Sequence, residues 1–440
     1  MSNRHRSNIS RRDMLKTAGS SLALPLCMPG GARGKPRGSG VKDRLRIGII
    51  GTGSRGTDMI VSSSPVKQMQ LVAIADCDLR RMQAFVDVTR EVFPETAKCK
   101  RYQDYRKMLD QEKLDGVFVS TPTHGRVLPI IHACQAGVDV YAEKPITLTI
   151  EEGQMLVKAV RHYKRVFQAG AQARSLPLNR WAVQQVQQGA IGKIKKALVP
   201  NFNTPIDYVP QKAQPVPAEL DWNMWCNQSP LYPCNPTLAT ALSQWGLYSQ
   251  FDGDGSSGGM TGTGTHAFDQ IQWAIGKDNT SPVEIWTTEP DGSNCPVVMR
   301  YADGQVLEMM APAHVGPRFG GIFIGERGKV EINRNVVRSN PVEIAQSVPA
   351  FDNPYPGKDD TSYHIADWPD AIRTRRDPNC PVETAHRHSV LCHLANIARQ
   401  VKCRLRYNPK VDRFVGDDKA NNHPSVRRPR RKGYELPNLG

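Results

Sequence analysis

The sequence lacks the features that identify several classes of protein. It has 10 cysteines in 440 residues and no CxxC pair, so neither a disulfide-rich scaffold nor a cysteine-based metal site is expected. Cys226 and Cys234 are a candidate pair for an oxidising compartment, but isolated buried thiols are the simpler interpretation. No apolar run reaches the roughly 18 residues of a membrane-spanning helix. The 36 glycines and 33 prolines are too few for a collagen-like chain.

Excess charge is missing from the body of the chain, although the formal net charge is +16. Residues 1–46 hold 11 Lys and Arg against Asp13 and Asp43, and residues 401–440 hold 11 against four acids. Residues 47–400 therefore carry 36 charges of each sign. Because the basic ends lack interleaved aromatic residues, no nucleic-acid partner is expected.

Residues 1–43 have the pattern of an export signal followed by a linker. Arg11 and Arg12 precede a short, weakly apolar stretch, Thr17–Leu26, and a linker rich in Pro, Gly and Arg comes next. Paired arginines before such a stretch indicate the twin-arginine route, so we expect a periplasmic or otherwise exported protein with no membrane contact after signal removal. A disordered basic tail is the alternative, and in either case the fold should begin near Leu45.

A strand and a glycine-rich turn open the predicted core. The β-branched run Leu45–Ile50 ends in Gly51–Gly56, which reads GxGxxG, and an amphipathic segment follows. In a dinucleotide-binding fold the first glycine makes the tight turn, the second lets the backbone approach the pyrophosphate, and the third permits close helix packing. The phosphates then lie on the free N–H groups of the helix N-terminus. The residues expected to hold the nucleotide here are Gly51, Gly53, Ser54, Arg55 and Gly56.

A second strand, Gln70–Ala75, ends in Asp76. An acid at this place accepts hydrogen bonds from the adenosine ribose hydroxyls and repels a 2′-phosphate. Asp76 therefore favours NAD, while Arg80 and Arg81 leave NADP open as the alternative cofactor.

Two further strands end in polar residues. Gly116–Ser120 runs into Thr121-Pro122, and Val138–Ala142 runs into Glu143-Lys144-Pro145. Repeated β-α-β units predict an α/β fold with a doubly wound parallel sheet, whose ligand lies at the carboxyl ends of the strands. The same crevice should therefore also contain Ser120, Thr121, Pro122, Glu143 and Lys144.

These motifs, together with Gly170–Arg174 and Gly264–Asp269, resemble those of the Gfo/Idh/MocA oxidoreductases, the glucose–fructose oxidoreductase and inositol dehydrogenase family. The resemblance covers about residues 45–435. It implies a Rossmann domain over 44–165 and a C-terminal α/β substrate domain over 166–385, whose open, mainly antiparallel sheet often forms the oligomer interface. Residues 386–440 would supply a closing helix and a C-terminal strap. The implied partners are a nicotinamide cofactor, a small carbohydrate substrate and a second copy of the chain.

The resemblance also implies catalytic residues. Lys144 matches the family lysine that moves the hydroxyl proton, and a nearby nicotinamide would disfavour its ammonium form. The simpler interpretation of Lys144 is a solvated turn residue. His266 matches the family histidine that meets the reacting hydroxyl, although alone it would be taken for a packing residue. Asp269, one helical turn later, is expected to orient His266 or to cap the helix.

One departure from the family pattern concerns the substrate. Many family dehydrogenases carry an aspartate where this chain has Gly262, so the lysine–aspartate–histidine set is incomplete. Trp245 is expected to stack on a sugar ring, with core packing as the alternative. Arg174 is a weaker candidate for an acidic or amide-bearing sugar. The histidines His386, His388 and His393 have no convincing ligand spacing, so no metal is predicted.

Three classes of function remain open. The first is an exported NAD(P)-dependent oxidoreductase that acts on a sugar or polyol with a tightly held cofactor. The second is a redox-neutral glycosidase-like or epimerase-like enzyme, in which a hydroxyl is oxidised only transiently. The third is a sugar-binding protein without activity.

Overall fold

The computed structural model describes residues 44–439 except 64–65, 236–237, 239–244, 252–258, 290–293, 313–315 and 353–359. The predicted twin-arginine signal, residues 1–43, lies outside the described residues. No helix among the described residues is long and apolar enough to cross a membrane.

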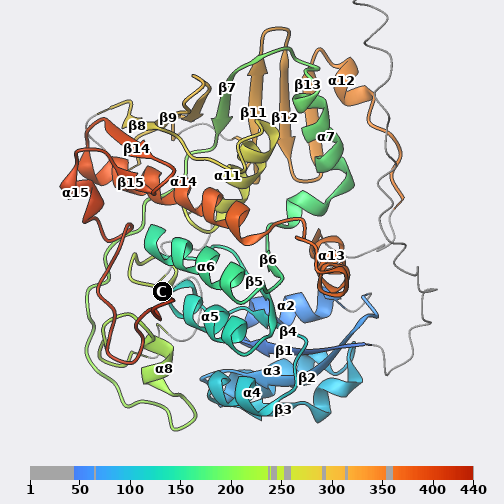
Figure 1. The fold of residues 1–440 in the computed structure, drawn as a ribbon, viewed down its shortest axis with the longest axis vertical. Helices are drawn as coiled ribbons and strands as arrows, with labels where there is room; N and C mark the ends of the chain where they lie inside the picture. Colours follow the sequence, from blue (N-terminus) through green and yellow to red (C-terminus); the bar gives the residue numbers. More distant parts are fainter. Residues whose placement is uncertain are drawn as a thin grey trace, which may run out of the picture. The chain divides into compact units, whose positions relative to one another are not determined.

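The first half of the chain forms the predicted parallel sheet (Figure 1). Its strands are β1 Leu45–Ile50, β2 Met69–Ala75, β3 Lys100–Tyr102, β4 Gly116–Val119, β5 Asp139–Ala142 and β6 Phe167–Ala169. Their order is β3-β2-β1-β4-β5-β6, and every adjacent pair is parallel. The order reverses between β1 and β4, which is where a doubly wound sheet binds its ligand. The sheet includes β6, so it runs past residue 165, where we expected the Rossmann domain to end.

Helices connect these strands, and side-chain caps fix several of their starts. They are α2 Ser54–Ser63, α3 Leu79–Thr89, α4 Tyr105–Gln111, α5 Val127–Gln135 and α6 Ile150–His162, with short 3₁₀ turns η2 Pro94–Lys98 and η3 Thr123–Gly125. The Asp78 carboxylate accepts from the Arg80 N–H at the start of α3, and Thr149 Oγ1 accepts from the Glu152 N–H at the start of α6. Each cap satisfies a backbone donor that the helix itself leaves free.

The second half forms a mixed, mainly antiparallel sheet of nine strands, as the resemblance implies. Its strands are β7 Ile194–Val199, β8 Glu284–Thr287, β9 Val297–Arg300, β10 Val306–Met309, β11 Gly320–Gly325, β12 Lys329–Asn333, β13 Val336–Asn340, β14 Leu405–Asn408 and β15 Arg413–Phe414. Their order is β13-β12-β11-β7-β10-β9-β8-β14-β15, and among these only β7 and β10 pair in parallel.

Helices of the second half pack against both sheets. They are η4 Gln172–Ser175, α7 Pro177–Gln187, α8 Trp222–Cys226, α11 Thr263–Ala274, α12 Glu343–Gln346, α13 Asp360–Thr374, α14 Val382–Val401 and α15 Asp418–Asn421. Helices α7, α11 and α14 contact the nine-stranded sheet and share its apolar core. Helix α13 instead packs into the core of the first half, where Trp368 is fully buried beside Phe118 and Tyr141.

Candidate active site

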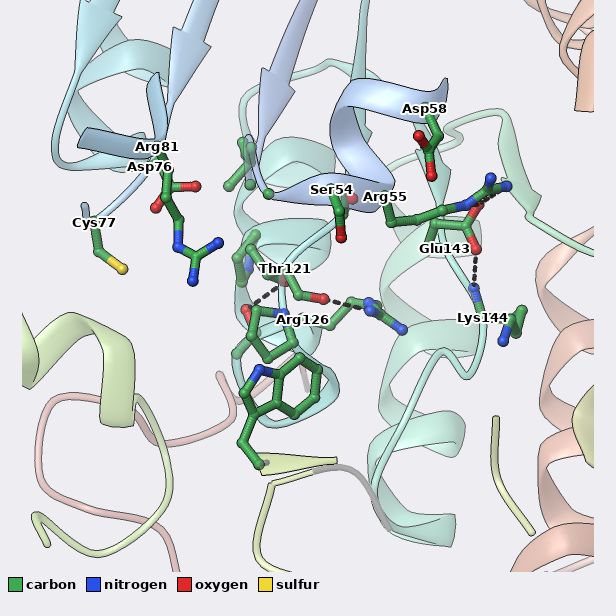
Figure 2. A pocket seen from close by; sticks show the side chains of 18 of the residues that line it. Ser54, Arg55, Asp58, Asp76, Cys77, Arg81, Thr121, Arg126, Glu143 and Lys144 are labelled. Carbon is green, nitrogen blue, oxygen red and sulfur yellow. Dashed lines mark hydrogen bonds and ion pairs between the residues drawn. The ribbon is translucent and has the colours of Figure 1, made fainter. Parts of the chain in front are cut away.

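A cavity of about 750 Å³ lies at the carboxyl ends of the parallel strands, and residues from both halves line it (Figure 2). Asp76, Cys77 and Arg81 lie at one end of the view, and Glu143 and Lys144 lie at the other. The predicted residues that line this cavity are Gly51, Gly53, Ser54, Arg55, Asp76, Ser120, Thr121, Pro122, Glu143, Lys144, Trp245 and His266. These residues, predicted from separate motifs, therefore lie around one cavity.

The glycine turn has the backbone geometry that its sequence predicts. Gly51 has φ +93°, and a Cβ there would lie 2.7 Å from the Thr121 nitrogen. A Cβ on Gly56 would lie 2.3 Å from the Gly51 carbonyl oxygen. Gly56 therefore lets α2 approach the turn from behind and is not part of the cavity lining, while the α2 N-terminus faces the cavity through Ser54 and Arg55.

Asp76 holds the loop in place at the end of β2. Its carboxylate accepts hydrogen bonds from the Thr52 backbone N–H at 2.7 Å, the Thr52 hydroxyl at 3.0 Å and the Asp78 N–H at 3.0 Å. Burial raises the pKa of Asp76, and these hydrogen bonds partly offset that effect. Across the cavity the Ser120 hydroxyl is buried without a hydrogen-bond partner among the described residues. A ribose or phosphate group would satisfy such a donor, so the residues present fit a dinucleotide.

Glu143 and Arg55 form an ion pair beside the glycine turn. The Arg55 Nη2 atom lies 2.8 Å from Glu143 Oε1, and the glutamate is 2% exposed. Burial alone would raise the pKa of Glu143, but the nearby Arg55 and Lys144 outweigh it and lower the pKa. The pair joins the N-terminus of α2 to the end of β5, so it fixes the position of these two elements relative to each other at the cavity.

Lys144 reaches across to the second half of the chain. Its Nζ donates to the Gly262 carbonyl oxygen at 3.2 Å, and the Lys144–Pro145 peptide bond is cis. The guanidinium of Arg126 donates to the carbonyl oxygens of Pro145 and Thr121 and so holds the backbone next to the lysine. The partner of Lys144 Nζ is thus a backbone carbonyl, which can hold the ammonium but cannot take a proton.

His266 begins the second turn of α11 and is 6% exposed. Burial, followed by the charges of Lys144 and Arg334, lowers the pKa of His266 well below 6.5. The ring is therefore neutral near pH 7. Its Nδ1 atom is buried without a hydrogen-bond partner among the described residues. A neutral imidazole with an unused nitrogen in a cavity is suited to a hydroxyl group.

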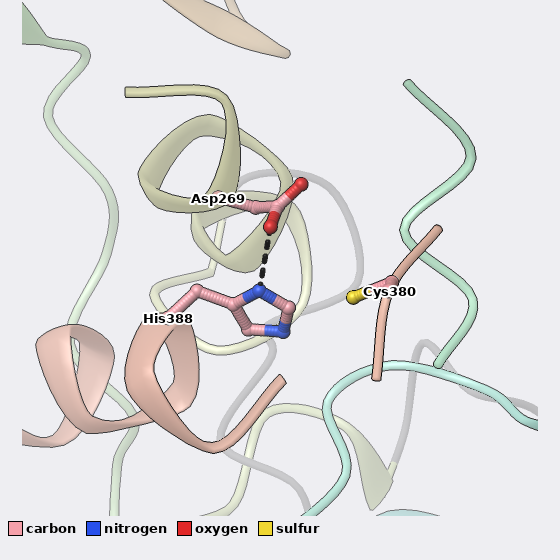
Figure 3. Close-up of side chains that lie close together, drawn as sticks. All are labelled: Asp269, Cys380 and His388. Atoms are coloured by element: carbon pink, nitrogen blue, oxygen red, sulfur yellow. Dashed lines mark hydrogen bonds and ion pairs between the residues drawn. The ribbon is translucent and has the colours of Figure 1, made fainter. Parts of the chain in front are cut away.

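Arg174 and Asp269 lie outside the cavity lining, contrary to the expected substrate contact. Arg174 Nε lies 2.7 Å from Asp269 Oδ1, and its Nη2 lies 2.7 Å from Asp278. The Arg174 guanidinium thus forms ion pairs with two carboxylates and is almost fully buried, so it does not point toward a sugar in the cavity. Asp269 in turn accepts from His388 Nδ1 at 2.8 Å, so it orients His388, and among the described residues it makes no bond to His266 (Figure 3).

Asp269, Cys380 and His388 place ligand atoms within 4.8 Å of one another. The same Asp269 oxygen already accepts from Arg174 and His388, and burial raises the pKa of the Cys380 thiol well above 9. A guanidinium beside the carboxylate and a protonated thiol are poor surroundings for a cation. We interpret this cluster as a buried polar network that joins α11 to α14.

Several residues of the cavity wall were not predicted from the sequence. Phe319 packs edge-on against His266 with ring centroids 5.8 Å apart, and Arg334 lies over Phe319 at 4.5 Å. Both lie in loops of the second sheet, Phe319 directly before β11 and Arg334 directly after β12, and neither belongs to a local motif. Gln103, Tyr105, Met224, Asn227 and Thr361 also line the cavity. Trp245 does line it, but the cluster that packs around Trp225 and Phe251 is largely buried core.

The parallel sheet, the glycine turn and the acid after β2 define a dinucleotide-binding Rossmann protein. One family model, the oxidoreductase family with an NAD-binding Rossmann fold, matches residues 45–171. A second, the C-terminal alpha/beta domain of the same oxidoreductase family, matches residues 206–436. The chain therefore belongs to the Gfo/Idh/MocA oxidoreductase family, as its motifs indicated.

Two curated relatives each match about a third of the chain. A glycosyl hydrolase family 109 protein of Shewanella pealeana is 29% identical over 165 residues, which cover 34% of this chain and 36% of the relative. A 2,7-anhydro-N-acetylneuraminate hydratase of Mediterraneibacter gnavus is 25% identical over 146 residues, covering 33% of this chain and 36% of the relative. The matched regions span less than half of each relative.

Solved structures share the fold over most of the chain. The myo-inositol 2-dehydrogenase of Lactobacillus plantarum has a TM-score of 0.55 at 18% identity and covers 83% of this chain and 100% of its own. The WlbA dehydrogenase of Bordetella pertussis, solved with NADH and UDP-GlcNAcA, has a TM-score of 0.57 at 18% identity and covers 83% of this chain and 99% of its own. At this identity the likeness concerns the fold alone.

Proposed function

We propose that this protein is an exported NAD(P)-dependent oxidoreductase that acts on a CH–OH group of a sugar, polyol or sugar derivative. The observation that carries the proposal is the single cavity shared by the glycine turn, Asp76, Lys144 and His266. NAD is favoured over NADP because the Asp76 carboxylate would repel a 2′-phosphate.

Different residues of the chain would bind the cofactor, move the proton and bind the substrate oxygen. The α2 N-terminus and Ser120 would hold the phosphates and ribose, and Asp76 would hold the adenosine ribose. Lys144, held on the Gly262 carbonyl, would move the hydroxyl proton, while neutral His266 would bind the same oxygen. A nicotinamide bound there supplies the hydride acceptor or donor.

The twin-arginine pattern supports a closed redox cycle. That route carries folded proteins, so the cofactor could travel already bound, and a nicotinamide lost outside the cytoplasm would not be replaced. Each turnover should then return the cofactor to its starting state.

Replacing Arg11 and Arg12 by lysine should leave the protein in the cytoplasm, which cell fractionation measures. Continued export of that variant would refute the twin-arginine route.

A redox-neutral reaction is the second candidate. Glycosyl hydrolysis and hydration leave no net oxidation, and these are the reactions named for two of the matched relatives. The loss of a carboxylate at Gly262 fits a departure from simple polyol dehydrogenation.

The deciding assay follows product at saturating sugar with and without added NAD, while recording the absorbance of reduced nicotinamide. A panel of sugars and glycosides supplies the substrates. An unchanged rate and no accumulation of free NADH support the closed cycle, whereas stoichiometric NADH indicates an ordinary dehydrogenase. Binding of sugar without turnover across the panel would favour the third candidate, a sugar-binding protein.

We also propose a homo-oligomer that forms through the nine-stranded sheet. The support is the family resemblance, which implies that this sheet often forms the oligomer interface; within the chain, α7, α11 and α14 contact the sheet. Light scattering on the purified protein tests this, and a monomer at micromolar concentration would refute it.

A further inference from the structure

One segment of the second half crosses the nucleotide crevice. We call this segment, residues 217–228, the clasp; it contains α8 and the residues on either side of it. Near β2 the clasp forms an antiparallel bridge between Leu220 and Asp78. The Leu79 N–H donates to the Glu219 carbonyl at 3.1 Å, and the Asp221 N–H donates to the Cys77 carbonyl at 2.9 Å. The clasp is thus joined by backbone bonds to the loop that follows Asp76.

The other end of the clasp is attached beyond β4. His124 Nε2 lies 2.7 Å from the Trp225 carbonyl oxygen, and Gln228 Nε2 donates to the His124 carbonyl at 3.0 Å. His124 follows Thr121 and Pro122, which line the cavity. The clasp therefore spans from the carboxyl end of β2 to the carboxyl end of β4, across the switch point of the sheet.

The C-terminal strap, residues 424–440, holds the clasp from outside. Arg431 donates to the Asn227 carbonyl at 2.8 Å, to the Asn223 carbonyl at 2.8 Å and to Asn223 Oδ1 at 2.7 Å. The Tyr434 hydroxyl also donates to the Asn223 carbonyl, at 3.2 Å. Figure 1 shows the strap, in dark red, running beside α8. These bonds fix a helix of only five residues that has little stability of its own.

From these contacts we propose that the clasp completes the adenosine end of the nucleotide site and keeps the cofactor from leaving. Met224, Trp225 and Asn227 of the clasp line the same cavity as Asp76, and Gln103 donates to the carbonyls of both Cys77 and Glu219. A nucleotide that extends from Asp76 to Lys144 passes beneath this bridge. Its release then requires the clasp to detach from β2 or from β4. The inference rests on the proposed nucleotide binding, and it assigns the tight retention to residues 217–228.

A reversible cross-link tests the inference directly. Asp78 and Leu220 form a non-hydrogen-bonded antiparallel pair, for which the Cα atoms lie about 4.5 Å apart, inside the range of about 4.4–6.8 Å for disulfides. Asp78→Cys with Leu220→Cys, in a Cys77→Ser background, should form a disulfide that locks the clasp. Release of bound NADH, followed by its fluorescence after dilution, should slow by more than about tenfold on oxidation, equivalent to about 1.4 kcal/mol in the barrier. Equal release rates in the oxidised and reduced protein would overturn the proposal.

The opposite change loosens the clasp without touching the cavity. Arg431→Ala removes three hydrogen bonds and should speed NADH release by about tenfold or more. Arg427→Ala is the matched control, because Arg427 is an exposed arginine of the same strap that bonds to Asn422. The rate of NADH release could be unchanged in Arg431→Ala and equal in the two redox states of the cross-linked variant. That result would overturn the proposed role of the clasp but not the proposed nucleotide binding. A protein that binds no NADH in any form would overturn the proposed function as well.

Discussion

At the scale of single residues, Lys144 is the side chain on which the proposed chemistry most depends. Among the described residues its Nζ donates to the Gly262 carbonyl at 3.2 Å, and this partner is neutral. Lys144→Ala should reduce turnover by about 10²–10⁴-fold, the usual contribution of a positioned acid or base. The bound nucleotide should remain, since other residues hold it. Steady-state rates and the absorbance of the purified protein measure the two effects, with the exposed Lys158→Ala as a control; undiminished turnover would exclude the role.

Asp76 gives a second residue-scale prediction. Asp76→Ala should weaken NAD binding by about 1–3 kcal/mol, the cost of losing charge-assisted hydrogen bonds. It should weaken NADP binding less, because the carboxylate no longer repels a 2′-phosphate. Calorimetric titration with both nucleotides measures this, and the exposed Asp87→Ala on α3 should behave like the original protein. Equal NAD affinity in Asp76→Ala would contradict the assignment.

At the scale of elements, α13 shows that the two halves do not have independent cores. Trp368 fills the space beside Gly116, where an added Cβ would lie 2.7 Å from its ring. Trp368→Ala should lower the free energy of unfolding by about 3–5 kcal/mol. Trp286→Ala on the second sheet, where the ring is only half buried, should cost less. Chemical denaturation compares the two, and a smaller loss for Trp368→Ala would contradict this role of α13.

The sequence predicted the elements whose signals are local. The run Leu45–Ile50, the glycines of the turn and Asp76 stand in one stretch of chain, and their geometry follows from that order. The sequence also predicted that Lys144 and His266 share a cavity, because the family motif carries both. It did not predict the partner of Arg174, since a buried ion pair with Asp269 and Asp278 depends on how η4 and α11 pack.

Long-range placements were beyond sequence reasoning for the same physical reason. Phe319 and Arg334 reach His266 only because the nine-stranded sheet brings their loops there. The insertion of α13 into the first core likewise has no local pattern, because an amphipathic helix does not specify which sheet it covers.

At the scale of the whole molecule, buried histidines predict a pH-dependent stability. Burial lowers the pKa of His124 to about 4 and of His393 to about 3, and it also lowers the pKa of His364 and His386. In the unfolded chain these groups titrate near about 6.5, so below that pH the unfolded state binds more protons. The contribution of these histidines to stability should be constant above about pH 7.5 and fall below about pH 6.5, by as much as about 1.4 kcal/mol per pH unit for each histidine.

Urea unfolding at pH 8, 6.5 and 5 measures this dependence. The exposed His162→Gln should leave the pH profile unchanged and serves as the control. A free energy of unfolding that stays level from pH 8 to pH 5 would contradict the prediction.

The fastening of the clasp also sets an order of events during synthesis. Asn223 and the Arg431 side chain that holds it are 208 positions apart in the chain. At the usual elongation rates of about 5–20 residues per second, a ribosome needs about 10–40 seconds to pass from one to the other. The Rossmann core is complete once α13 has been made, and at that point the clasp still lacks its bonds to Arg431. On the proposed role of the clasp, we expect the nucleotide to enter more readily between the synthesis of α13 and the emergence of the strap.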